Sequence, residues 1–381
     1  KDLGTYFISD DGEKGMLTLV GDDGLVHHQL NHTSTVTGRF SSSSPNLQNL
    51  PKGNKSRVKE ILKSRFPGGS IVQSDFSSLE IYCQAWLTRD DQLVADLAAG
   101  LDLHCVRLAA KEHMDYAEVH ALCKGDKYDK EWDYKRTGAK VYSFQRAYGA
   151  GISTIAKATG MSEEEVQQLA DAEDARYPKI NQFFNDLEKQ IEGNAVPTST
   201  FIAHPVNPAV RVQLRISRIR TPDGKKYTFR SHPSPAWQLK RGVTSTFSPT
   251  ERKNYAVQGL GAQTMKAAMW LAVQEWYAKE NFGGLSLLTN TVHDACYCDA
   301  APAIARESAE LLHACMLAAS VFIEWWHKWE LPLPVPSDTS SGPNMGVEEP
   351  CTWEGFAENY KEHYDRICNT RIGAHSPSWL R

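Results

Sequence analysis

Residues 136–151 read RTGAKVYSFQRAYGAG. Within this stretch Arg136, Lys140, Phe144 and Tyr148 follow one another at steps of four residues. On an α-helix such steps place all four side chains on one side of the axis. Two cations therefore precede two aromatic rings on a single helix face. That order predicts a helix that binds a polyphosphate through its cations and stacks a flat base and sugar on its rings.

The composition of the chain is that of an ordinary globular protein. Of its 381 residues, 41% are hydrophobic and 23% are charged, and the formal net charge is -4. This charge argues against an evenly basic protein that coats nucleic acid, but it is compatible with a locally basic cleft. The eight cysteines lack the spacing of a zinc site, so we expect reduced, mostly buried thiols and a cytoplasmic location. No apolar run reaches the roughly eighteen residues of a membrane span.

The hydrophobic pattern predicts strands near both ends of the chain and helices between them. Predicted strands occupy residues 15–30 (a hairpin), 70–76, 209–230 (a basic hairpin) and 286–300 (two strands joined at His293 and Asp294). Predicted helices occupy residues 91–111, 136–192, 250–280 and 302–330, with a capping box at Ser162 and Glu165. The fold class is therefore α+β, a sheet platform that carries an inserted helical lobe.

Two aspartates stand out by their positions. Asp75 ends an apolar strand, and Asp294 lies at the turn of an apolar hairpin. Metal-assisted phosphoryl transfer needs carboxylates that converge on two divalent ions about 3.5–4 Å apart. Such oxygen ligands suit Mg²⁺. A lone aspartate at the end of a strand is usually a turn residue or a helix cap, so this interpretation depends on the helix of residues 136–151.

Five segments occur in the order found in family A DNA polymerases and resemble characteristic segments of that family. They are TVTGRFSSSSPNLQNLP (35–51, the TGR segment), DFSSLEIYCQAWL (75–87, motif A), RTGAKVYSFQRAYGAG (136–151, motif B), KNYAVQGLGAQ (253–263, the glutamine-containing helix) and TVHDACYCDA (291–300, motif C). The resemblance runs from about residue 35 to about residue 347, and GPN at 342–344 leans towards the phage branch. It implies a polymerase right hand, with an antiparallel palm sheet and an inserted helical fingers lobe.

The resemblance also implies an activity. The implied activity is that of a template-directed DNA polymerase, which adds dNTPs to a primer 3′-hydroxyl and releases pyrophosphate. By the same resemblance Asp75 and Asp294 hold two Mg²⁺ ions, with the Phe76 carbonyl as a further ligand, and Mn²⁺ can substitute. Lys140 then gives a proton to the pyrophosphate. A pair of carboxylates that holds two metals is suited to such phosphoryl transfer.

The resemblance assigns residues to the dNTP site and to the end of the primer–template. The dNTP site comprises Arg136, Lys140 and His104 at the triphosphate, Phe144 and Tyr148 at the sugar and insertion site, and Glu80, which blocks a ribose 2′-hydroxyl. The primer–template end comprises Arg39, Asn254, Gln258, His293 and Gly149. Nine basic side chains between Arg211 and Arg241 bind template phosphates or, equally well, form a solvated hairpin.

The resemblance divides the chain into palm (1–85), fingers (86–249) and palm again (250–381). The residues ahead of the TGR segment are too few for the helical thumb and the proofreading exonuclease that the family usually carries there. Expected partners are therefore primer–template DNA, dNTPs, and another polypeptide or a missing upstream segment that supplies both. No membrane partner is expected.

Two alternatives remain open. The first is a single-subunit RNA polymerase, which shares the spacing of the motif B helix; Phe144 and Glu80 argue against it, because those enzymes have methionine and a small residue there. The second is a catalytically silent DNA-binding subunit, suggested by the missing thumb and by Ala295, which follows Asp294 where motif C normally has glutamate. The presence of both Asp75 and Asp294 argues against it.

Overall fold

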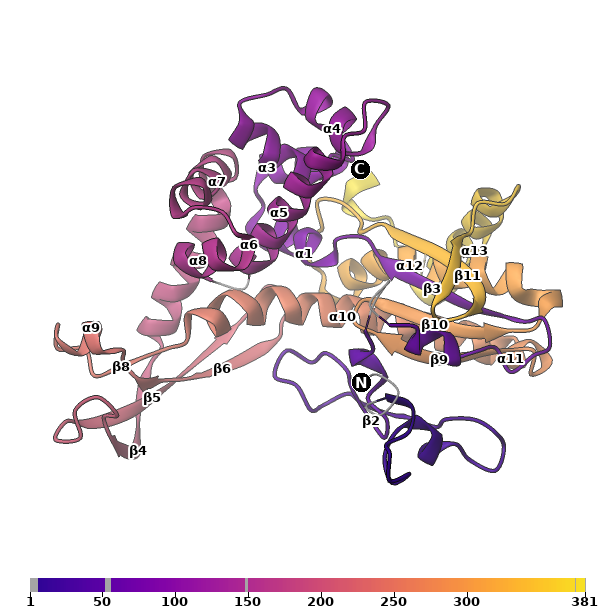
Figure 1. The fold of residues 1–381 in the computed structure, drawn as a ribbon, viewed down its shortest axis with the longest axis horizontal. Coiled ribbons are helices and arrows are strands. Elements are labelled where there is room, and N and C mark those ends of the chain that lie inside the picture. The colour runs from indigo at the N-terminus through magenta and orange to yellow at the C-terminus, as the bar shows by residue number, and fades with distance from the viewer. Residues whose placement is uncertain (1–5, 52–55, 148–149, 374, 381) are drawn as a thin grey trace. The chain divides into compact units, whose positions relative to one another are not determined.

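The computed structural model of the chain describes residues 6–51, 56–147, 150–373 and 375–380 (Figure 1). Contacts divide the chain into two compact units. The first comprises Lys1–Glu80 and Gln258–Arg381, and the second comprises Ile81–Val257. The second unit is therefore an insertion within the sequence of the first.

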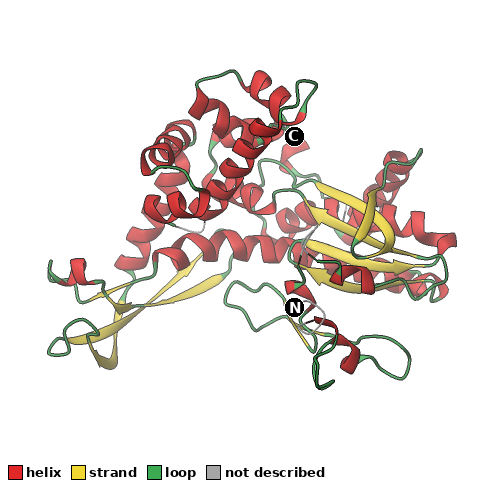
Figure 2. Ribbon diagram, viewed as in Figure 1, coloured by secondary structure: helices red, strands yellow, loops and turns green. Residues whose placement is uncertain are grey.

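A five-stranded sheet forms the centre of the first unit (Figure 2). Its order is β12 (Val347–Pro350), β11 (Ser337–Asn344), β3 (Ser70–Phe76), β10 (Ala295–Ala300) and β9 (Ser286–Val292). All neighbouring strands are antiparallel. The strands predicted at residues 70–76 and 286–300 are confirmed, as is the α+β fold class with an antiparallel sheet.

Helix α12 (Ala305–His327) packs against β3, β10 and β11. Small hydroxyl side chains join the strands of this sheet, since Ser74 Oγ lies 2.9 Å from Ser337 Oγ and 2.8 Å from Thr339 Oγ1. Within the described part of the chain, Pro302–His327 is the one helix whose length and composition would let it cross a membrane. Because 83% of its apolar window is buried inside the protein, it has the character of a central core helix.

The second unit consists of helices followed by a small sheet. Its elements are α2 (Asp91–Ala98), α3 (Leu103–Glu112), α4 (Tyr116–Lys124), α5 (Lys130–Ala147), α6 (Ile152–Thr159), α7 (Glu163–Arg176), α8 (Pro178–Gly193), β4 (Val196–Ala203), β5 (Arg211–Arg220), β6 (Lys226–Arg230), β7 (His232–Pro233), α9 (Ala236–Leu239) and β8 (Ser245–Thr246). The capping box of Ser162 and Glu165 is present at the start of α7. The buried Tyr142, Ile155 and Leu169 pack α5, α6 and α7 together.

One prediction about the chain outside these elements was wrong. The hairpin expected at residues 15–30 is a 3₁₀ helix at Met16–Leu19 followed by an isolated bridge between Val20 and Val26. Leu17, Leu19 and Val20 are exposed there, so no buried sheet face favours pairing. Conversely, the polar segment Ser337–Asn344 was not predicted as a strand, yet it forms β11 beside β3.

Glu275 ties α10 (Pro249–Ala278) to α13 (Phe356–Arg371). Its side chain is 1% exposed and lies 2.5 Å from Arg366 Nη2 and 2.9 Å from Arg371 Nε. Burial raises the pKa of Glu275, but the hydrogen bonds and charges of the two arginines outweigh burial and hold this pKa below its usual value of 4.5. The ion pairs therefore stabilise the fold above pH 4.5, and this contribution is lost as the pH falls through the lowered pKa.

Glu275→Gln should lower the free energy of unfolding at pH 7 by about 3 kcal/mol, because a buried charge partner of two arginines is removed. Urea unfolding followed by circular dichroism measures this loss. Glu362→Gln, at an exposed position of α13, is the matched control. Equal stability of the two variants at pH 7 would show that Glu275 does not anchor α13.

Candidate active site

Asp75 and Asp294 are held by two adjacent strands of the central sheet. In the pairing of β3 with β10, Ala295 lies directly opposite Asp75. The Phe76 amide donates a hydrogen bond to the Asp294 carbonyl at 3.1 Å. His293 has a φ of 54°, which allows the chain to turn sharply between β9 and β10. This register places the two aspartates at the same end of neighbouring strands.

Both aspartates line a cavity of about 740 Å³ within the first unit. Its other lining residues are Ser56, Arg57, Lys59, Glu60, Gln73, Phe76, Val292, His293, Ala295, Tyr297, Met345, Gly346 and Glu348. Burial, and then the charges of Glu348 and Asp75, raise the pKa of Tyr297 above its usual range. The Tyr297 hydroxyl is therefore neutral at ordinary pH. The cavity combines carboxylates with the basic side chains of Arg57 and Lys59.

The residues present fit a magnesium site built on two carboxylates. The Asp75 and Asp294 carboxylates and the Phe76 carbonyl are oxygen donors of the kind that Mg²⁺ binds, together with water and substrate phosphates. Ala295 is 3% exposed and belongs to an apolar cluster with Val292, so it supplies no donor. Across the described residues, no three His, Cys, Asp or Glu side chains form a group that could hold a metal. Substrate oxygens would have to complete the shell.

Arg39 and Glu80 form an ion pair beside Asp294. Arg39 Nη2 lies 2.7 Å from Glu80 Oε1 and 3.9 Å from Asp294 Oδ1. Glu80 lies in the first turn of α1 (Leu79–Thr88), where the positive end of the helix dipole favours a negative charge. Three residues that the sequence singled out separately therefore meet at one place.

In the second unit, α5 carries Arg136 and Lys140, and α3 carries His104. Arg136 Nε and Nη2 donate to Asp102 Oδ2 at 3.0 and 2.5 Å, and Lys124 Nζ lies 3.1 Å from the same oxygen. Burial raises the pKa of Asp102, but the hydrogen bonds from Arg136 and Lys124 outweigh it and hold the pKa well below its usual range. Asp102 is thus ionised and orients Arg136, while Lys140 is exposed on α5.

His104 lies against α5, where its Nδ1 is 3.2 Å from Ser143 Oγ. Burial and then the positive charge of Arg107 lower the pKa of His104 to about 4. The ring is therefore neutral at pH 7. A neutral imidazole can donate one hydrogen bond to a phosphate oxygen, but it contributes no charge.

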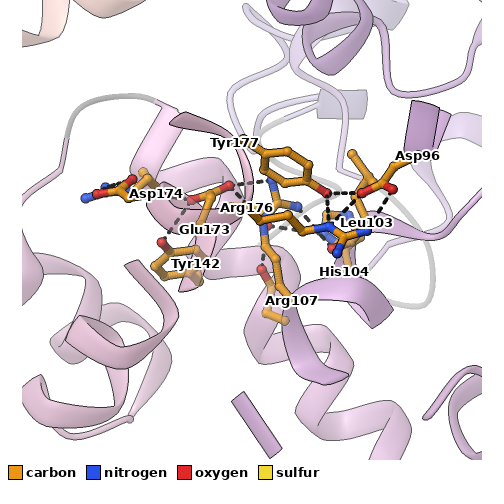
Figure 3. Close-up of polar contacts among 12 residues, drawn as sticks. Asp96, Leu103, His104, Arg107, Tyr142, Glu173, Asp174, Arg176 and Tyr177 are labelled. Atoms are coloured by element: carbon orange, nitrogen blue, oxygen red, sulfur yellow. Dashed lines mark hydrogen bonds and ion pairs between the residues drawn. The ribbon is translucent and has the colours of Figure 1, made fainter. Parts of the chain in front are cut away.

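A buried network joins α3, α5 and α7 (Figure 3). Arg107 Nε and Nη2 donate to Glu173 Oε1 at 2.8 and 2.6 Å, and the Tyr142 hydroxyl donates to Glu173 Oε2 at 3.0 Å. Arg176 donates to both carboxylate oxygens of Asp96 at 2.7 and 2.8 Å. Glu173 therefore fixes the helix that carries Arg136 and Lys140 to the helix that carries His104.

The sequence did not reveal the acidic residues that orient these cations. Asp102 is the N-cap of α3, and that ordinary role accounts for an aspartate at this position without any ligand. Glu173 lies 66 residues from Arg107 along the chain, so no local pattern links them. The one signal of a contact on this side of α5 was Tyr142. It lies two residues from Lys140 and hence on the side of α5 opposite to that lysine.

The structure describes the remaining predicted residues only in part. Tyr148 and Gly149 lie outside the described residues, and Phe144 belongs to α5 with its backbone alone described. Asn254 and Gln258 are half-exposed and lie one turn apart on α10, on the same side of the helix. The described residues thus bring predicted site residues together in two groups, one around Asp294 and one around α5.

Comparisons with known proteins agree on one family. The model of "DNA polymerase family A" matches residues 12–346. The chain is similar to DNA polymerase I of Caldicellulosiruptor bescii, with 27% identity over 191 residues that cover 49% of this chain and 21% of that protein. It is also similar to DNA polymerase I of Pseudomonas aeruginosa, with 25% identity over 275 residues that cover 71% and 25% respectively. The chain thus spans about a quarter or less of these relatives.

A solved structure has a similar fold. It is the POL domain of Pol1 from M. smegmatis in complex with DNA primer-template and dNTP. The TM-score is 0.62 at 22% sequence identity, and the match covers 87% of this chain and 50% of that one.

The pKa of His104 should be about 4 in the folded protein. An NMR titration of the histidine ring signals measures it, with His104→Gln used to assign the resonance. Between pH 6.5 and 4 the unfolded chain binds more protons at this residue than the folded chain, so its contribution to stability should decrease as the pH falls. A titration midpoint near 6.5 would mean that the ring is neither buried nor close to the cations of α3 and α5.

Proposed function

Because this chain belongs to DNA polymerase family A, we propose that it is a template-directed DNA polymerase. It extends a primer 3′-hydroxyl with dNTPs and releases pyrophosphate. The observation that carries this proposal is the register of β3 and β10, which places Asp75 and Asp294 beside each other on one cavity. Two carboxylates in this arrangement serve two-metal phosphoryl transfer.

Asp75 and Asp294, with the Phe76 carbonyl, would hold two Mg²⁺ ions, and Mn²⁺ can replace them. When bound, the ions lower the pKa of the primer 3′-hydroxyl and neutralise the triphosphate and the departing pyrophosphate. The strand pairing keeps the two carboxylates in place before substrate arrives. The loss of the motif C glutamate at Ala295 leaves these two aspartates to serve the ions.

Arg136, Lys140 and His104 bind the triphosphate in this proposal. Asp102 accepts from Nε and Nη2 of Arg136, which orients the guanidinium and directs its remaining N–H donors elsewhere. Lys140 provides a compact cation and the proton for pyrophosphate. His104 donates one neutral hydrogen bond. The charge on the triphosphate is thus met by two cations on a helix that Glu173 holds in place.

Glu80 selects the sugar. In this proposal its carboxylate excludes a ribose 2′-hydroxyl, so deoxynucleotides are the substrates, and Phe144 and Tyr148 pack on the incoming sugar. The ion pair with Arg39 supports this role, because it holds the carboxylate beside the catalytic Asp294.

Primer–template DNA is contacted at its end by Arg39, Asn254, Gln258, His293 and Gly149. Donors in the minor groove test the shape of a base pair without reading its sequence, because acceptors occur there on every pair.

The small sheet of the second unit binds template phosphates. Arg218, Arg220, Lys226 and Arg230 are exposed on β5 and β6, and Arg220 lies directly opposite Lys226. Like charges opposite each other destabilise a sheet, so an anionic partner would relieve this pair. Free thiols at all eight cysteines support a cytoplasmic location.

Asp294→Asn should reduce the rate of primer extension by dNTPs in Mg²⁺ by about 10³-fold, which corresponds to about 4 kcal/mol of transition-state stabilisation. Affinity for primer–template should change little, because the residue contacts ions rather than DNA. Single-turnover extension measures the rate, and Asp365→Asn, at an exposed position of α13, is the matched control. Extension by Asp294→Asn at the rate of the control would contradict the proposed mechanism.

A further inference from the structure

The small sheet of the second unit carries a dense positive charge. Between residues 195 and 250 the sequence has nine Lys and Arg side chains and one acid, Asp223, although the whole chain has a net charge of -4. Asp223 is only 2% exposed, so it presents almost no negative surface. Such a concentration of cations is the electrostatic signature of a surface that binds a polyanion.

Two aromatic rings lie on the outside of this sheet. Phe201 on β4 is 47% exposed, and Trp237 on α9 is 56% exposed. The three other Phe, Tyr and Trp side chains of residues 195–250 are Tyr227, Phe229 and Phe247, and all three are buried in one apolar cluster. The core of the sheet is therefore built from other rings, and core packing does not account for Phe201 and Trp237.

Each of these exposed rings has an arginine over it. The guanidinium carbon of Arg211 lies 5.4 Å from the centroid of the Phe201 ring, and that of Arg241 lies 5.4 Å from the centroid of the Trp237 ring. Both arginines are exposed as well. An arginine beside an aromatic ring can bind a phosphate while the ring stacks on a base. Each ring–arginine pair therefore matches one nucleotide.

A buried histidine joins the segments that carry the two rings. His204 directly follows β4, is fully buried, and has its Nε2 2.9 Å from the Ser234 carbonyl oxygen. Its Nδ1 accepts from the Val206 amide at 3.1 Å, so in the neutral ring Nε2 carries the proton and donates to Ser234. Ser234 lies three residues before Trp237. This bond thus fixes the strand of Phe201 to the segment that leads to Trp237.

Stacking on exposed rings distinguishes a single strand from a duplex. In a duplex the face of each base is covered by the neighbouring pairs, so an aromatic side chain can stack only on an unpaired base. Every base offers such a face, so the contact is tolerant of sequence. Exposed rings among many cations therefore fit a single-stranded nucleic acid.

We propose that the two ring–arginine pairs, Phe201 with Arg211 and Trp237 with Arg241, form a binding site for single-stranded nucleic acid. The rings stack on bases, and the arginines bind the phosphates beside them. The identity of the strand rests on the proposed polymerase function, under which it is the unpaired template. The inference deepens the phosphate contact of this sheet, since it adds recognition of unpaired bases.

The test is the affinity of the full chain for an oligodeoxythymidylate of about sixteen nucleotides, measured by fluorescence anisotropy. Phe201→Leu and Trp237→Leu should each weaken binding about tenfold, the scale of one stack between a base and a ring. Trp237→Phe should retain most of the affinity, because a phenyl ring still stacks. The matched control is Tyr277→Leu, which removes an 82% exposed ring from the first unit and should have no effect.

Two further measurements separate bases from phosphates, in variants whose circular dichroism matches that of the unsubstituted chain. An abasic oligonucleotide of the same length keeps the phosphates, and its affinity should not change in the two leucine variants. Arg211→Gln and Arg241→Gln should each reduce the slope of log affinity against log salt concentration by about 0.7, the value for one phosphate contact on a single strand.

Unchanged affinity for the thymidylate in both leucine variants would overturn the inference, as would equal weakening of the abasic probe or an equal effect of Tyr277→Leu. Binding by Trp237→Leu as tight as that by Trp237→Phe would also overturn it, and would indicate an apolar surface for a protein partner. If the affinities behave as expected but the unsubstituted chain extends no primer, the proposed polymerase function is refuted and the single-strand site stands.

Discussion

The hydrogen-bonded pairing of β3 with β10 is the constraint on which the proposed active site depends. It sets Ala295 opposite Asp75 and joins the Phe76 amide to the Asp294 carbonyl. On the other edge of β3 the Ser337 hydroxyl donates to the Asp75 carbonyl at 3.0 Å. A slip of one residue would turn every side chain of β3 to the opposite face of the sheet. With neighbours on both sides, β3 cannot slip without breaking two ladders, so the position of Asp75 is determined by the sheet as a whole.

Each group of cations in the two units is oriented by an acid. Asp102 holds Arg136, Glu80 holds Arg39, and Glu173 joins the helices that carry Arg136, Lys140 and His104. Cations that are already oriented lose less conformational freedom when a phosphate or a sugar binds. Each carboxylate already accepts hydrogen bonds from part of its guanidinium. Fewer N–H donors therefore remain for an unrelated anion.

The sequence predicted what local patterns encode. The apolar runs of β3, β9 and β10 identified the strands, the Ser162–Glu165 box identified the start of α7, and the order of the motifs identified the fold class. It could not predict β11, because SDTSSGPN has low strand propensity and pairs only because the edge of β3 is available. Nor could it find the acids that orient the cations, since those contacts depend on tertiary packing.

We infer that Asp75 and Asp294 together hold the divalent ions. The most direct measurement is Mn²⁺ binding, by electron paramagnetic resonance, to the full chain with a dideoxy-terminated primer–template and the matching dNTP. About two tightly bound ions per complex are expected for the unsubstituted chain. Asp75→Asn combined with Asp294→Asn should abolish tight binding. An undiminished number and affinity of bound Mn²⁺ ions in that double variant would show that these two carboxylates do not hold the ions.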